Sequence, residues 1–141
     1  MKVHIAWPGR EEIKARVELD SEQNIVKAEL LGIGGPDFIR AVAAFRERLK
    51  GPLAKLEAPA GARAHEIMLR ELVLRLKGEW SPPYKDDEIC HCRVVPTQTV
   101  DLAICTGAHT SRQVSELTAA STACGTCRPD VEAMIQYRLK R

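Results

Sequence analysis

The chain is poor in aromatic residues and has no long apolar run. Its 141 residues include only two Trp, two Tyr and two Phe, so its hydrophobic cores must be built from aliphatic side chains. No stretch approaches the roughly 20 apolar residues that a membrane-spanning helix needs. Pro8 and Gly9 also interrupt the N-terminal segment before a signal peptide could form its apolar core. We therefore expect a cytoplasmic protein with no membrane partner, in a compartment where thiols stay reduced.

An excess of one charge is also missing. The chain has 21 basic and 19 acidic residues, a formal net charge of +2, and its basic residues form no run beside stacking aromatic side chains. Because nucleic-acid-binding proteins usually carry such a basic surface, no nucleic-acid partner is expected. The sequence contains no recognisable catalytic triad and no paired carboxylates, so it predicts no enzymatic activity.

Cysteine is absent from residues 1–89, whereas residues 90–141 contain all five. Between the two halves, residues 81–88 are charged and contain Pro82 and Pro83, which is typical of a linker. The sequence therefore predicts two domains, at residues 1–80 and 89–141.

The first half combines strand and helix patterns. Apolar residues alternate with charged ones from Ile13 to Leu19, and a similar alternation places Val26, Ala28 and Leu30 on one face of a following strand. With a further strand near the N-terminus, this predicts a three-stranded sheet. Beyond the glycine-rich run 32–35 the period becomes helical, over residues 38–49 and again over 68–76. An α+β fold with helices on one face of the sheet is expected.

The second half reads as three short helices. Their predicted apolar positions are Val100, Ala103 and Ile104, then Val114 and Leu117, then Val131, Met134, Ile135 and Leu139. A domain below about 70 residues commonly needs a metal or another cross-link to stabilise so thin a core. The cysteines are the candidates for that role.

Two closely spaced cysteine pairs lie at opposite ends of this half. Cys90 and Cys92 are separated from Cys124 and Cys127 by 31 residues. Four thiolates suit a 2Fe–2S cluster or a Cys₄ zinc site, and exclude magnesium and calcium. A single residue between ligands is less typical of zinc, and a redox disulfide is a third possibility. Cys92 and Cys127 each precede a predicted helix start, where free N–H groups favour an anionic centre.

The residues around these cysteines resemble a known family. The segments Ile89–Cys92, Ala103–Ile104, Gly107–Ala108 and Cys124–Cys127, with Thr110 and Thr118, are similar to the 2Fe–2S domain of bacterioferritin-associated ferredoxin (BFD-like), which also forms the middle of NifU-type cluster-assembly proteins. The resemblance implies a small all-helical domain in which Cys90, Cys92, Cys124 and Cys127 bind a 2Fe–2S cluster. Cys105 lies outside this set and is expected to be a small buried residue.

The order of elements in residues 1–80 resembles the scaffold domain of NifU and IscU proteins. The resemblance is carried by residues 17–20, 25–30 and 32–35 and by Ala64–Glu66. The three cysteines that such a scaffold needs are missing, since the matching places hold approximately Arg10, Gly34 or Gly35, and Glu66. This implies a degenerate scaffold used for docking or for dimerisation.

These patterns favour a 2Fe–2S protein accessory to iron–sulfur cluster assembly, which uses its cluster to donate electrons or holds it for transfer. Its partner would be a redox or cluster-assembly protein, with a homodimer also possible. One alternative is a stand-alone electron-transfer ferredoxin whose N-terminal domain docks a reductase or oxidase. A zinc-stabilised interaction module is the other.

Overall fold

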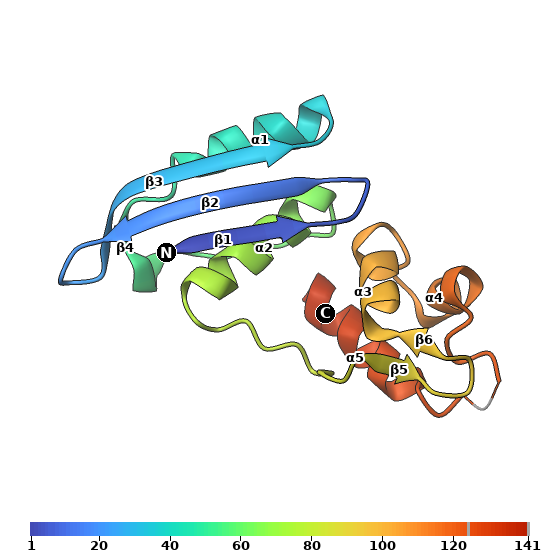
Figure 1. Cartoon of the computed structure of the whole chain (residues 1–141). Helices are drawn as coiled ribbons and strands as arrows, with labels where there is room; N and C mark the ends of the chain where they lie inside the picture. The colour runs from blue at the N-terminus through green and yellow to red at the C-terminus, as the bar shows by residue number, and fades with distance from the viewer. Residues whose placement is uncertain (124, 141) are drawn as a thin grey trace. The chain divides into compact units, whose positions relative to one another are not determined.

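The computed structural model describes residues 1–123 and 125–140. The chain divides into two compact units, the first spanning Met1–Trp80 and the second beginning at Ser81 (Figure 1). Within the described ranges, none of the helices is both long enough and apolar enough to cross a membrane.

The first unit is built on an antiparallel sheet in the order β1-β2-β3-β4. Its strands are β1 (Lys2–Ala6), β2 (Glu12–Leu19), β3 (Asn24–Ile33) and β4 (Gly51–Pro52). The prediction of three strands was wrong by one, because Gly51 and Pro52 pair with Ile25 and Asn24. A two-residue strand is too short to show an alternating pattern, and a proline gave no reason to expect one.

Helices cover one face of this sheet (Figure 1). They are α1 (Pro36–Arg46) and α2 (Ala64–Leu76), with the 3₁₀ turn η1 (Leu53–Lys55) between them. Alternate residues of β2, including Ile13 and Val17, are buried beneath the helices with Val42 and Leu72. A Cβ at Gly32 would lie only 3.0–3.1 Å from three atoms of the Val42 side chain. Glycine is therefore needed there for α1 to pack closely on β3.

Among the described residues of the first unit, no helix lies on the opposite face of the sheet, and β3 exposes apolar side chains. The register shifts between Glu18 and Leu19, where β2 pairs with β3. Val26, predicted to point inward, is exposed, as are Leu31 and Ile33. A register irregularity of this kind depends on the pairing of two strands, so the period of one strand does not reveal it.

The second unit contains α3 (Thr97–Cys105), α4 (Ser111–Thr118) and α5 (Arg128–Leu139). It also contains an antiparallel hairpin, formed by β5 (Glu88–Cys90) and β6 (Val95–Pro96). The prediction of an all-helical domain was therefore wrong. Two strands of two and three residues carry too little sequence to show a period, and their pairing arises only once the chain turns at residues 91–94.

The helices of this unit pack around aliphatic side chains as predicted, with one exception. Val100, Ile104, Val114 and Val131 are buried, but Leu117 is 70 % exposed. Arg138 of α5 is buried and donates Nε and Nη2 hydrogen bonds, each of 2.7 Å, to the two carboxylate oxygens of Asp101 on α3. This bidentate ion pair joins the last helix to the first helix of the unit.

Candidate metal centre

Three of the four predicted ligands lie around one cavity. Cys90 ends β5 and is 2 % exposed, Cys127 stands at the N-cap of α5 and is 6 % exposed, and Cys92 is exposed in the hairpin turn. All three line a cavity of about 200 Å³, together with Tyr84, Ile89, His91, Thr126 and Asp130. The fourth, Cys124, lies outside the described residues.

The Cys90 sulfur accepts several hydrogen bonds. Burial by itself would raise the pKa of this thiol, but bonds from the backbone N–H groups of Ser121, Arg93 and Cys92 and from the Cys127 side chain outweigh it, so the pKa of Cys90 is lower than that of an ordinary cysteine. A lowered pKa favours the thiolate, which is the form that binds metal. Residues from both cysteine-bearing loops therefore meet at one sulfur.

The loop between α4 and α5 completes this arrangement. The Ser121 hydroxyl lies 2.9 Å from the Cys127 sulfur. Arg93, which follows Cys92, donates a 3.1 Å hydrogen bond from Nε to Oγ1 of Thr122. The bond between Arg93 and Thr122 joins residues 29 positions apart in the chain, and so it ties the turn after Cys92 to the loop before Cys127.

The two predicted helix starts differ in their relation to the cysteines. Cys127 lies at the start of α5, as predicted, and its carbonyl accepts the bond from Val131 N. Cys92 does not precede a helix directly, because β6 intervenes, and the Thr97 N–H at the start of α3 bonds to the Asp87 carbonyl at 2.8 Å. The N-terminus of α5 is therefore the one positioned near a predicted ligand.

The donor set is chemically suited to a cluster. Among residues 1–123 and 125–140, no three His, Cys, Asp or Glu side chains are gathered closely enough to hold a metal ion. A 2Fe–2S cluster is larger than a single ion and needs four thiolates. Two hydrogen-bonded sulfurs, with a third sulfur on the same cavity, are soft ligands of the kind that iron–sulfur clusters use.

Two further residues lie near the predicted ligands in the sequence. Cys105 is buried on α3 and does not line the cavity, which confirms its expected role as a small core residue. His91, although it lies between two predicted ligands, is largely exposed, with Nδ1 3.4 Å from Glu88.

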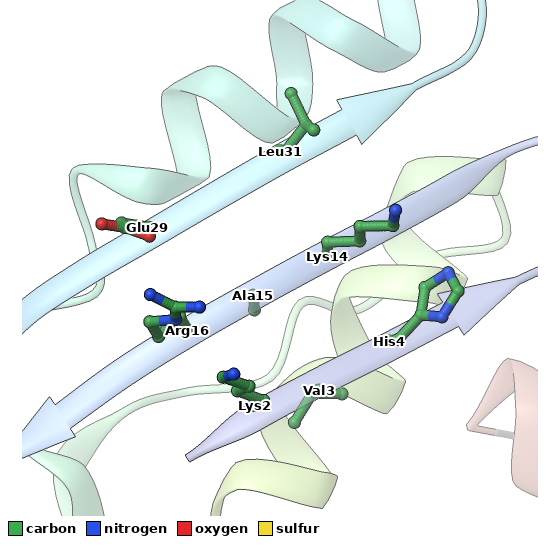
Figure 2. A pocket seen from close by; sticks show the side chains of 8 residues that line it. All are labelled: Lys2, Val3, His4, Lys14, Ala15, Arg16, Glu29 and Leu31. Carbon is green, nitrogen blue, oxygen red and sulfur yellow. The ribbon is translucent and has the colours of Figure 1, made fainter.

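A second candidate surface lies on the uncovered face of the sheet. A groove of about 420 Å³ is lined there by the outward side chains of Lys2, His4, Lys14, Arg16, Glu29 and Leu31, which are labelled in Figure 2. We call these six residues the open-face groove. Lys2 stands opposite Arg16 and His4 opposite Lys14 in the strand register. The sequence hinted at this surface only through the alternation that turns Lys14 and Arg16 away from the core.

Comparison with known proteins identifies the second unit. Residues 88–137 match the family model of the BFD-like 2Fe-2S binding domain, which confirms the resemblance found around the cysteines. The chain thus carries an iron–sulfur binding domain, and its cofactor is a 2Fe–2S cluster. No curated protein and no solved structure matches the chain, and the resemblance of residues 1–80 to NifU and IscU scaffolds stays a prediction.

Proposed function

We propose that this chain carries single electrons through a 2Fe–2S cluster bound by Cys90, Cys92, Cys124 and Cys127. One observation supports the proposal above all. Cys90 at the end of β5 and Cys127 at the start of α5 line the same cavity, and their side chains contact each other. When bound, the cluster supplies a one-electron redox couple. The chain's own residues exclude water from two of the sulfurs and donate hydrogen bonds to them.

Burial of the ligands favours electron transfer over release of the cluster. The side chains of Cys90 and Cys127 are almost fully buried, so an incoming thiol has little access to them. Cys92 is exposed at the same cavity, which puts the cluster close to the surface. A short distance to the surface is sufficient for an electron to reach a docked partner, and no catalytic step by the chain itself is needed.

Holding a cluster for transfer, as an accessory of iron–sulfur assembly, is the second candidate. One observation favours it: Cys92 is exposed in a hairpin turn, where a thiolate of an acceptor protein could replace it as a ligand of the cluster. Mixing the cluster-loaded chain with an apo-acceptor separates the two functions. An electron carrier keeps its cluster, whereas a cluster donor loses it to the acceptor within the experiment.

The ligand assignment is tested by anaerobic purification, iron and sulfide analysis, and electron paramagnetic resonance of the dithionite-reduced protein. Cys90→Ala, Cys124→Ala and Cys127→Ala should each lose the cluster. Cys105→Ala is the matched control, since it removes a buried thiol that does not line the cavity. A colourless zinc protein, or a Cys127→Ala variant with full iron content, would overturn the assignment.

We propose that the partner is a protein with an acidic surface, which docks on the open-face groove. Like charges directly opposite each other on neighbouring strands destabilise a sheet, and Lys2 stands opposite Arg16 in such register. Carboxylates of a partner would relieve this repulsion, while its apolar side chains could cover exposed Leu31. A second copy of the chain on this face, the homodimer, is the competing arrangement.

A further inference from the structure

Ser121 contacts two of the proposed cluster ligands at once. Its hydroxyl lies 2.9 Å from the Cys127 sulfur, and its backbone N–H donates to the Cys90 sulfur. A sulfur that binds iron carries no proton, so in the loaded protein the hydroxyl must be the donor in the bond to Cys127. Both Ser121 groups would then donate hydrogen bonds to ligand sulfurs.

The backbone at Ser121 is held in an unfavourable conformation. Its φ of 62° lies in the left-handed region, which residues with a Cβ rarely adopt. Ala119, two positions earlier, also has a positive φ and ends α4. Between them, Ala120 is fully buried, and its carbonyl accepts a 2.6 Å hydrogen bond from the Ser115 hydroxyl.

The surrounding contacts fix this loop in one place. Thr122 Oγ1 donates to the Ala119 carbonyl at 2.6 Å and accepts from Arg93. Strained conformations persist where neighbouring contacts over-determine them, and they gather at functional sites. Here the strain has a visible consequence, because it aims the Ser121 amide and hydroxyl at two different sulfurs.

We infer that Ser121 is a positioning residue that raises the reduction potential of the cluster by donating hydrogen bonds to Cys90 and Cys127. Reduction adds negative charge to the cluster and its thiolates, and a donor aimed at the sulfurs stabilises the more negative form. Removing the hydroxyl should therefore make the cluster harder to reduce. The inference rests on the proposed ligand set.

Two substitutions separate the hydroxyl from the backbone strain. Ser121→Ala removes the hydroxyl and keeps a Cβ in the strained conformation, whereas Ser121→Gly removes the hydroxyl and relieves the strain. We expect both variants of the full chain to shift the midpoint potential to more negative values by similar amounts. When each variant is poised at the wild-type midpoint potential, its ratio of reduced to oxidised cluster should be lower than that of the wild type by about threefold or more. The ratio reports the shift in potential directly, because the cluster is a one-electron couple.

Thermal unfolding of the same proteins provides the second readout. Ser121→Gly should be at least as stable as the wild type, while its potential still shifts. Thr106→Ala is the matched control, because it removes a hydroxyl that bonds the Leu102 carbonyl at the end of α3, away from the residues that line the cavity, and it should leave the potential unchanged. If Ser121 had a purely structural role, its substitutions would change the thermal stability and leave the midpoint potential unchanged.

The outcomes distinguish this inference from the proposed function. If the wild-type chain holds no cluster, the proposed function fails. If the wild type holds its cluster and Ser121→Gly keeps the wild-type potential, only the role of Ser121 is refuted.

Discussion

At the scale of single residues, the site is shaped by side chains and amides that are held in strained or tightly bonded conformations. Val94 is a second example beside Ser121. It lies in the hairpin turn two positions after Cys92, has a φ of 53° and is 71 % exposed. A β-branched residue at positive φ is an outlier, and an exposed one gains little from packing.

Replacing Val94 should therefore stabilise the protein. Val94→Gly removes the clash between Cβ and the backbone and should raise the free energy of unfolding by about 1 kcal/mol, because little buried contact is lost. Denaturant unfolding of the cluster-loaded protein measures the change. Val95→Gly is the contrasting variant, since Val95 is buried and its loss should destabilise. A destabilised Val94→Gly protein would contradict the account.

The fold lowers the pKa of Asp20 in the first unit. The amide of Asn24 donates to its carboxylate at 2.9 Å, and the amide of Glu22 does so at the same distance. These bonds, the Asn24 backbone bond foremost, hold the pKa of Asp20 below its ordinary value despite some opposing desolvation. The ionised carboxylate therefore organises the turn between β2 and β3.

This lowered pKa predicts a dependence of stability on pH. A carboxyl whose folded pKa is depressed stabilises the fold above its unfolded pKa, about 3.9, and loses that contribution as the pH falls through the folded value. Unfolding titrations below pH 4 should thus show a smaller loss of stability in Asp20→Asn than in the wild type. Identical pH profiles would exclude a role for the Asp20 charge.

At the scale of elements, the second unit depends on the contact between its first and last helices. The ion pair between Arg138 and Asp101 is bidentate and Arg138 is buried. By contrast, Arg112 and Glu116 form an exposed pair on α4, with Nε and Oε1 3.2 Å apart. Exposed pairs contribute little, whereas the loss of one partner of a buried pair is costly.

Asp101→Ala should consequently lower the free energy of unfolding by about 2–4 kcal/mol, because the Arg138 guanidinium loses both of its carboxylate bonds. Arg112→Ala, the matched control, should change it by about 0.5 kcal/mol or less. Chemical denaturation of the loaded protein, followed by circular dichroism, provides the comparison. Equal effects of the two variants would mean that the pair between α3 and α5 adds nothing to stability.

At the scale of the whole molecule, the two units should respond differently to removal of the cluster. Metal binding and folding are coupled in small domains, and the second unit has short helices around a thin aliphatic core. The first unit has its own buried core, with Trp7, Phe38 and Val42 among its members, and no cysteine.

Chelation of iron from the full chain should therefore unfold the second unit and leave the first unit folded. Hydrogen exchange followed by mass spectrometry tests this: amides of α3 and α5 should lose protection, while those of β2 keep it. Retained protection throughout the second unit would show that its core folds without the cluster.

Docking on the open-face groove is also a property of the whole chain. The partner would bind the first unit, whereas the cluster that supplies the electron belongs to the second. Poly-glutamate serves as the probe of an acidic surface. Its binding should weaken with added salt, and the double variant Lys14→Glu with Arg16→Glu should weaken it at least tenfold, about 1.4 kcal/mol. Arg112→Glu, on the second unit, is the control. Equal binding by both variants would remove the groove from the proposal, and dimerisation through the same face would favour the second copy.

Local patterns in the sequence determined the elements with a clear period. Alternation placed Ile13, Ala15 and Val17 in a strand with one buried face, and helical spacing placed Phe38 and Val42 in a helix. The cysteine spacing and neighbouring residues indicated the 2Fe–2S domain. These features depend on residues close together in the chain, so that intrinsic conformation and one-sided burial are sufficient to reveal them.

Other features were decided only by tertiary packing. The fourth strand, the hairpin before α3 and the contacts of Ser121 with two sulfurs each bring together residues from different segments. The exposure of Val26 and Leu117 likewise depends on how those segments pack. No local period records such a contact, because it forms only after the segments have packed and the register of their strands is fixed. The sequence by itself therefore pointed to the cofactor, whereas the arrangement of donors around its ligands came from the tertiary structure.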